Sequence, residues 1–191
     1  MQSVIQQLFV QVILIALNAF FAMTEIAVIS LSGNKLKKME EEGDKKAGAL
    51  LKLVEEPAAF LSTIQIGITL AGFLGSAFAA DSFSDYIVTW LYDGIGIRAV
   101  PLSVLNTLSV VIVTIILSYF TLVFGELIPK RIAMQKSMEV AKFACGVVSG
   151  LAKVMSPVIW FLSFSTNSIL KLLHLKTEAE EETVTEEEIR M

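Results

Sequence analysis

The sequence has little of what soluble enzymes commonly use for catalysis or for disulfide bonds. Among its 191 residues there is one cysteine, Cys145, and one histidine, His174. One cysteine cannot form a disulfide within the chain, and one histidine gives little support to a His-rich zinc site or a Ser-His-Asp triad. The HExxH and GxSxG motifs are missing, as is any basic stripe interleaved with aromatic residues. We therefore expect neither an enzyme nor a protein that binds nucleic acid.

Charge is nearly absent from three long apolar stretches, residues 5–31, 57–80 and 101–126. Glu25 is the only charged residue of the first stretch, the second contains no charged residue, and the third is uncharged until Glu126. Each is long enough to cross a hydrocarbon core, which takes about 20 residues of helix. Apolar residues make up 54 % of the chain and the mean hydropathy is +0.69, which also favours contact with lipid. The pattern predicts an all-α integral membrane protein with three transmembrane helices.

The basic residues predict how these helices are oriented. The leader MQSVIQQ has no Lys or Arg, whereas a cleaved signal peptide begins with a positive region, so we expect a retained first helix. Residues 32–56 contain six lysines, residues 81–100 contain Arg98 as their one basic residue, and three more basic residues follow the third stretch. Because Lys and Arg are enriched in cytoplasmic loops, we expect a multi-pass protein of the cell (inner) membrane. Its N-terminus would lie outside and its C-terminus in the cytoplasm.

Residues 138–175 form a fourth apolar stretch that differs from the other three. It carries scattered lysines, and Pro157 interrupts it. We expect juxtamembrane helices here, lying along the cytoplasmic surface with Trp160 and His174 at the interface; a fourth span broken at Pro157 is the alternative. Residues 177–191 hold seven glutamates and one arginine, which predicts an acidic linker. The chain ends in what resembles the first turn of a helix, so we expect a soluble domain downstream.

The few polar residues of the three apolar stretches predict a cation site. A charged residue at the centre of a membrane helix costs about 2.5–3.5 kcal/mol on insertion scales, and it usually has a function. Counting about 1.5 Å of rise per residue places Glu25 and Glu126 in the cytoplasmic half of the membrane. A stripe of polar or small residues at helical spacing runs along each of the first two helices. On the first helix it includes Ala22 and Glu25, with Thr24 adjacent, and on the second it includes Gln65, Thr69 and Gly72, flanked by Gly67. Gln65 and Gly67 enter from the inner side, so their depth matches that of the two acids.

The third apolar stretch ends in Gly-Glu-Leu-Ile-Pro-Lys, residues 125–130. Pro129 has no N–H to donate to the carbonyl oxygen of Gly125, so this carbonyl is free to bind another group. A set of oxygen ligands without sulfur or imidazole suits Mg²⁺ or Ca²⁺. We expect the segment from Gly125 to Pro129 to act as a hinge, and we expect Gly72 to let the second helix bend.

Each of these residues also has a plainer structural interpretation. The stripe of small residues on the second helix is typical of close helix packing. Glu126 could pair with Lys130 one turn later, Glu25 could be a protonated hydrogen-bond donor, and Asn18 could bond to a neighbouring helix. The depth that the two acids share with the other oxygen-bearing residues favours the cation site.

Three motifs resemble the transmembrane domain of the CNNM/CorC family, which is known as DUF21. They are Asn-Ala-Phe-Phe-Ala-Met-Thr-Glu-Ile-Ala at 18–27, Ser-Thr-Ile-Gln-Ile-Gly-Ile-Thr-Leu at 62–70 and Gly-Glu-Leu-Ile-Pro-Lys at 125–130. The resemblance covers residues 1–176, and the tail is similar to the lead-in to a CBS-domain pair. It implies three spans, a cytoplasmic belt of juxtamembrane helices and a homodimer in the lipid bilayer. It also implies Mg²⁺ export driven by Na⁺.

The resemblance also assigns residues to the site. Gly125, Glu126 and Pro129 match the third-helix motif of the family, and Gly67 matches its second-helix glycine. Two positions depart from the pattern, since some relatives have serine in place of Ala22 and asparagine in place of Gly72. The ligands that would substitute there are Thr24, Thr69 or backbone oxygens.

These observations lead to one expected mechanism and one alternative. We expect a Mg²⁺ exporter, coupled to Na⁺, that works by alternating access around the oxygen-lined site. The alternative is a membrane regulator that does not transport, in which the helices anchor a cytosolic sensor and the glutamates bind an ion structurally.

Overall fold

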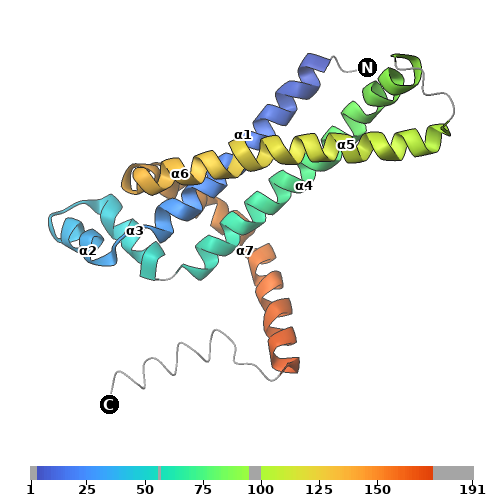
Figure 1. Ribbon diagram of the computed structural model, residues 1–191. Helices are drawn as coiled ribbons and strands as arrows, with labels where there is room; N and C mark the ends of the chain where they lie inside the picture. Colours follow the sequence, from blue (N-terminus) through green and yellow to red (C-terminus); the bar gives the residue numbers. More distant parts are fainter. Residues whose placement is uncertain (1–3, 56, 95–99, 174–191) are drawn as a thin grey trace. The chain divides into compact units, whose positions relative to one another are not determined.

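The computed structural model describes residues 4–55, 57–94 and 100–173, and these residues form helices and no strand (Figure 1). The long helices are α1 (Val4–Ile29), α4 (Ala58–Thr89), α5 (Leu102–Leu122) and α7 (Ser137–Leu172). The predictions for Arg98, His174 and the acidic tail 177–191 fall outside the described residues. The expected all-α class is confirmed.

Two of these helices continue without a loop into further helical segments. α4 runs on into the π-helical segment η1 (Trp90–Gly94), and α5 runs through the π-helical segment η2 (Val123–Leu127) into α6 (Ile128–Gln135). Four described stretches are long and apolar enough to cross a membrane, namely Val4–Ile29, Phe60–Gly94, Leu102–Gln135 and Ser137–Leu172. The expected membrane class is therefore confirmed, with one more candidate span than the three predicted.

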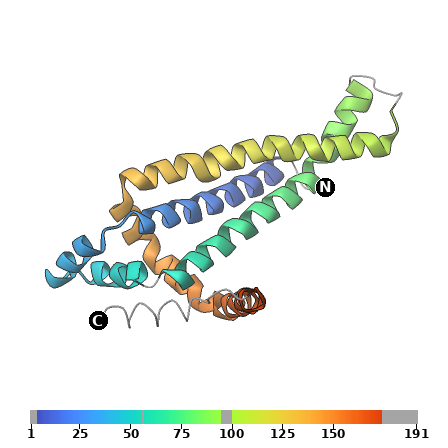
Figure 2. The same ribbon diagram turned by 60° about the horizontal axis from the view of Figure 1, so that its bottom comes forward.

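The chain divides into two compact units, Met1–Val148 and Ser149–Met191. In the first unit α1 packs against α4 on one side and against η2 and α6 on another, while α5 packs mainly on α4 and η2. Figure 2 shows α1 running between α4 and α5. Fully buried side chains such as Ala22, Ile64 and Leu105 fill the contacts between these helices. This packing brings the late part of α1 beside the Gly-Glu-Leu-Ile-Pro-Lys motif.

The second predicted span differs from the structure in its length. Residues from 81 onward were expected in an external loop, yet α4 remains helical to Thr89 and continues as η1. Ser82 and Leu91 are both buried, so the helix keeps packing partners beyond the apolar stretch. Polar residues placed outside the lipid do not end a helix that still has such partners.

The fourth apolar stretch forms one continuous helix rather than helices separated at Pro157. α7 carries Pro157 in its interior, where proline leaves the carbonyl of Lys153 without its usual backbone donor. Lys153, Val154 and Pro157 are all exposed, so water or lipid headgroups can reach this turn. In the second unit Trp160 and Phe164 stack with ring centroids 5.7 Å apart. The position of α7 along the membrane surface stays a prediction, as does the alternative of a fourth span.

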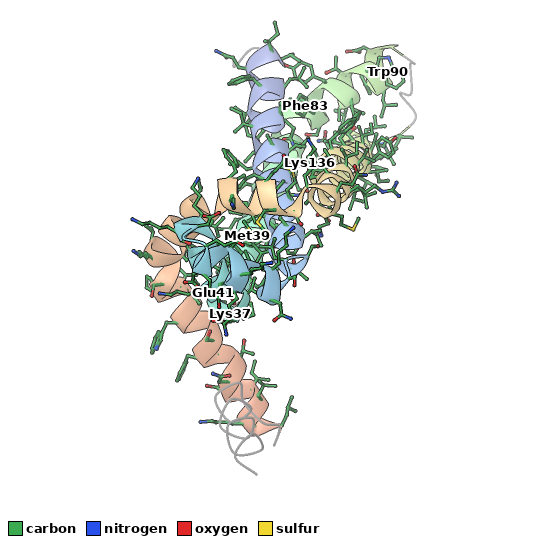
Figure 3. The ribbon with its side chains drawn as sticks, turned by 90° about the vertical axis from the view of Figure 1, so that its left-hand side faces the viewer. Lys37, Met39, Glu41, Phe83, Trp90 and Lys136 are labelled. Carbon is green, nitrogen blue, oxygen red and sulfur yellow. The ribbon has the colours of Figure 1, made fainter. Side chains whose placement is uncertain are left out.

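Two short helices, α2 (Gly33–Glu41) and α3 (Lys45–Glu55), connect α1 to α4. Figure 3 places Lys37, Met39 and Glu41 together on α2. Gly43 follows the C-terminus of α2, and its φ of 95° is left-handed. The N–H of Gly43 donates to Glu40 O at 2.8 Å. This is the usual role of glycine after a helix C-terminus, and it turns the chain sharply into α3.

Asp44 holds α3 and the beginning of α7 together. Its carboxylate accepts hydrogen bonds from the backbone N–H groups of Lys46 and Ala47 and so caps α3. The same carboxylate accepts a hydrogen bond from the ammonium of Lys142 on α7. These interactions, above all the one with Lys142, lower the pKa of Asp44 below its ordinary value, although partial burial opposes them. The ion pair therefore fixes the short helices to the part of α7 that belongs to the first unit.

Candidate cation site

The two acidic residues of the predicted site meet at one lysine. Glu25 lies near the end of α1 and Glu126 lies in η2, on separate segments of the chain. The Nζ atom of Lys130 is 3.4 Å from Glu25 Oε2 and 4.0 Å from Glu126 Oε2. All three side chains are about one-quarter to one-third exposed, at 25 %, 30 % and 32 %. The expected i,i+4 pair of Glu126 with Lys130 is present, and the lysine also binds the acid of α1.

Asn18 on α1 occupies the backbone site that Pro129 creates. Because Pro129 has no N–H, the carbonyl of Gly125 lacks the donor that an α-helix would provide. The side-chain Nδ2 of Asn18 donates to Gly125 O at 3.2 Å. Next to this bond the chain is π-helical, with the N–H of Ile128 donating to Val123 O. The helix–helix hydrogen bond that was expected as a plainer role of Asn18 is thus confirmed, and it uses the carbonyl that was predicted to be free.

The side-chain oxygen of Asn18 has no such partner within the described ranges. Asn18 is 1 % exposed, and its Oδ1 finds no hydrogen-bond donor among the residues that the structure describes. A Cβ built on Gly125 would lie 3.1 Å from Asn18 Nδ2, so the glycine is needed for α1 to approach η2 this closely. A buried amide oxygen without a donor is a suitable ligand for a cation.

The other predicted residues of α1 are buried beside these groups. Thr24 is fully buried, and its Oγ1 donates to the carbonyl oxygen of Phe20 at 2.7 Å. Its oxygen can still accept a bond, but the hydroxyl proton is already used within the helix. Ala22 is fully buried and offers no polar atom in its side chain, so it contributes packing.

The predicted residues of α4 lie on different faces of that helix. A Cβ on Gly67 would come within 2.7 Å of the ring of Phe21 on α1, so this glycine provides the space that the ring fills. The side chain of Gln65 is exposed, and its Nε2 donates to Thr69 Oγ1 at 3.5 Å. A Cβ on Gly72 would meet no atom within 4 Å.

The buried face of α4 is one residue out of phase with the predicted stripe. It runs through Phe60, Ile64, Ala71 and Ala79, whereas the stripe contained Gln65, Thr69 and Gly72. One residue corresponds to roughly 100° of rotation around a helix. The structure brings together Glu25, Gly125 and Glu126. Gln65 and Thr69 of α4 form no hydrogen bond with these groups among the described residues.

The charged groups of the site leave the two acids only partly neutralised. Two carboxylates and one ammonium leave one formal negative charge. No group of three or more His, Cys, Asp or Glu side chains that could hold a metal ion occurs within the described ranges. An entering cation would compete with the ammonium of Lys130 for the same carboxylates.

Two features of the site were not predicted from the sequence. One is the contact of Lys130 with Glu25, which joins residues that are far apart in the chain. The other is the free Oδ1 of Asn18. The sequence did signal the bond between Asn18 and Gly125, because an asparagine inside an apolar helix needs polar partners and Pro129 predicts a free carbonyl. It gave no signal for the oxygen that is left without a donor. The contact with Glu25 depends on how the helices pack and has no signal in the local sequence.

Comparison with known proteins adds the family. The model of the cyclin M transmembrane N-terminal domain matches residues 9–191. A UPF0053 protein of Synechocystis is 35 % identical over 194 residues, covering 99 % of this chain and 41 % of the relative. The UPF0053 protein YhdP of Bacillus subtilis is 31 % identical over 180 residues, covering 94 % of this chain and 40 % of the relative.

Another relative has a name that describes an activity. The polyamine export protein of Haemophilus influenzae is 28 % identical over 179 residues, covering 92 % of this chain and 40 % of that protein. The chain thus spans about two-fifths of the length of the curated relatives that it matches.

Proposed function

Because the chain belongs to the family of the cyclin M transmembrane N-terminal domain, a family of multi-pass membrane proteins, we propose that it exports a cation. The proposed cargo is Mg²⁺, its export is coupled to Na⁺, and the mechanism is alternating access. One observation carries this proposal: acids from two separate segments, Glu25 and Glu126, converge on Lys130 at a half-buried position. Intramembrane acids of this kind commonly mark ion pathways. The proposal includes no enzymatic activity.

The chemistry of the available ligands supports Mg²⁺ as the cargo. Carboxylate and amide oxygens are its preferred protein ligands, and Mg²⁺ keeps several waters when it is bound by one or two carboxylates. Glu25, Glu126 and Asn18 Oδ1 supply such a set. When the ion binds, Lys130 withdraws, so that the two charges of Mg²⁺ replace the single charge of the ammonium and balance the two carboxylates. Thr24 of α1 remains proposed as lining, since its oxygen can still accept a bond. Gly67, Gln65 and Thr69 remain proposed as well, because a shift of α4 would turn them toward the acids.

The proposed movement takes place around the Gly125–Pro129 segment. The π-helical turns there lack regular α-helical bonding, and π-bulges often occur at functional sites. The bond between Asn18 and Gly125 would hold one state and break in the other. Pro129 and Gly72 serve as hinges. The N-terminus outside, the cytoplasmic C-terminus, the homodimer, the inner-membrane location and a downstream CBS-type domain belong to the same proposal.

A polyamine is the second candidate cargo. The ammonium of Lys130 sits between the two carboxylates on a four-carbon chain, and an aliphatic amine would present the same group. The name of the Haemophilus influenzae relative, a polyamine export protein, favours this candidate as well. Competition separates the two candidates. If a polyamine is the cargo, an excess of unlabelled spermidine should reduce the flux of labelled spermidine, whereas an excess of Mg²⁺ should not.

The test of the function is flux through the purified protein in proteoliposomes. Mg²⁺ uptake is measured with and without an opposing Na⁺ gradient, and spermidine uptake is measured in parallel. Mg²⁺ flux that rises with the Na⁺ gradient supports the exporter. Flux of spermidine alone supports the second candidate. No flux of either, together with Mg²⁺ binding by calorimetry, contradicts export and favours the regulator that does not transport.

A further inference from the structure

A second set of polar side chains lies on α1 outside the candidate cation site. Gln7 and Gln11 precede Asn18 by eleven and seven residues, spacings that bring all three to one face of the helix. This face continues from the Asn18 level toward the N-terminal end of α1, which is the outer end in the proposed orientation. It extends the polar surface of the site by about 10–16 Å at the α-helical rise.

Several polar atoms of Gln7 and Gln11 are buried without a hydrogen-bond partner among the described residues. Gln11 is 7 % exposed, and neither its Oε1 nor its Nε2 has a hydrogen-bond partner among the described residues. Gln7 Oε1 is buried in the same way. On α5, Ser109 is fully buried, and its Oγ has no partner within the described part of the chain. Buried polar groups are almost always hydrogen-bonded, so these atoms need a ligand.

The Gln11 amide packs against Gly75 on the opposing helix. A Cβ added to Gly75 on α4 would lie 3.3 Å from Gln11 Nε2 and 3.9 Å from Leu14 Cβ. A larger side chain at position 75 would therefore crowd the amide. Gly75 is itself buried, which places the Gln11 amide between α1 and α4 rather than in lipid.

The chemistry of these groups identifies the kind of ligand. Gln11 offers both a donor and an acceptor, and Gln7 Oε1 on the same helix adds a neutral oxygen. A bare divalent ion needs charged oxygens, and it would not pair with an amide N–H. Water satisfies both kinds of group, and so does the water shell of a hydrated cation.

We propose that the Gln7–Gln11 face of α1 lines the outer half of the translocation path, where the cation leaves the candidate site in hydrated form. The inference rests on the proposed transport function for its cation. The presence of water beside Gln11 is a separate claim, and it can be measured without transport.

Cysteine accessibility tests this inference on the complete protein. Replacing Cys145 by serine removes the one native thiol, after which Gln11→Cys and Gln7→Cys are introduced singly. Val12→Cys is the matched control, because Val12 adjoins Gln11 in the chain and is 62 % exposed on the outer surface of the helices. A charged, membrane-impermeant methanethiosulfonate reagent is applied to the outer side of vesicles. Gel filtration verifies that each variant is folded.

We expect Gln11→Cys to react at least about tenfold faster than Val12→Cys, because a thiol ionises and reacts in water but not in lipid. Gln7→Cys should react faster still, because Gln7 is less buried than Gln11 and lies one turn further out. This variant also tests the path if Gln11→Cys does not fold. Rates equal to that of Val12→Cys at both positions, or reaction from the cytoplasmic side alone, would overturn the inference.

Flux measured on the same variants separates the inference from the function. Labelling together with Mg²⁺ flux supports both. Mg²⁺ flux without labelling would contradict the water-lined outer path and would still support export. Labelling of a protein that transports neither Mg²⁺ nor spermidine would support water beside Gln11 and would contradict export.

Discussion

The side-chain amide of Asn18 donates to the carbonyl oxygen of Gly125 at 3.2 Å, in place of the backbone N–H that Pro129 lacks. This bond connects the first long helix to the motif that carries Glu126. It explains three residues at once: proline removes the backbone donor, glycine allows the approach, and asparagine supplies the replacement. The same helix contact brings Glu25 to Lys130.

Replacing Asn18 by alanine should destabilise the protein. The Gly125 carbonyl would lose its donor while buried, which costs about 1–3 kcal/mol. Thermal unfolding in detergent measures the change, and Asn106→Ala is the control because Asn106 is an exposed asparagine on α5. Equal melting temperatures for the two variants would contradict the role given to the hydrogen bond.

A double-mutant cycle with Pro129→Ala tests the same bond from its other side. Alanine at position 129 restores an N–H that can donate to Gly125 O. Asn18→Ala should then cost less in the Pro129→Ala background than in the wild type, with a coupling of about 0.5–3 kcal/mol. Additive effects on the free energy of unfolding would show that the proline and the asparagine are unrelated.

Gly67 and Gly72 should respond differently to alanine. Gly67→Ala places a methyl group within 2.7 Å of the Phe21 ring, and overpacking of this kind costs about 1–3 kcal/mol. Gly72→Ala meets no atom within 4 Å and should be neutral or stabilising by up to about 1 kcal/mol. Phe21→Leu should partly rescue Gly67→Ala. A larger loss of stability at position 72 than at position 67 would contradict the helix packing.

Lys130→Met should make the cation site stronger. The variant leaves Glu25 and Glu126 without their shared counter-charge, so we expect Mg²⁺ to bind about tenfold more tightly or better. The melting temperature should fall in the absence of Mg²⁺ and recover as Mg²⁺ is added. Lys136→Met is the control, since Lys136 pairs with the exposed Glu139. Unchanged or weaker Mg²⁺ binding in calorimetry would exclude competition between Lys130 and the ion.

Acid should release the contact between α3 and α7. The interaction with Lys142 lowers the pKa of Asp44 below its ordinary value of 3.8. A carboxyl group with a lowered pKa in the folded state stabilises the protein above its ordinary pKa, and this contribution disappears as the pH falls through the lowered value. Unfolding measured between about pH 5 and pH 2 should show this loss in the wild type and a smaller one in Asp44→Asn. Identical pH profiles would exclude the ion pair as the cause.

Much of the fold could be predicted because lipid requires long apolar helices whose backbone groups bond internally. Glu25 and Glu126 stood out for the same reason. The length of α4 could not be predicted, since Ser82 and Leu91 are buried by partners from elsewhere in the chain. The buried face of α4 was also missed. A stripe of small and polar residues has no fixed direction until a neighbour such as Phe21 fills the space over Gly67.

The sequence indicated the two acids and a carbonyl without a backbone donor, but it did not indicate the partners of these groups. The motif at 125–130 predicts the unpaired carbonyl from covalent chemistry alone. The donor that satisfies it lies 107 positions away in the chain, and the partner of Glu25 lies on α6. Such contacts depend on how the helices pack, and no local pattern encodes them.

The central claim is that Glu126 carries the transported cation, and Mg²⁺ flux through Glu126→Gln tests it most directly. Glu139→Gln is the matched control, because Glu139 is 76 % exposed and also pairs with a lysine. Flux is measured in proteoliposomes under an opposing Na⁺ gradient. We predict that Glu139→Gln retains the wild-type flux while Glu126→Gln loses about 90 % of it or more, since the ion loses a charged ligand. Wild-type flux in a folded Glu126→Gln protein would contradict the account.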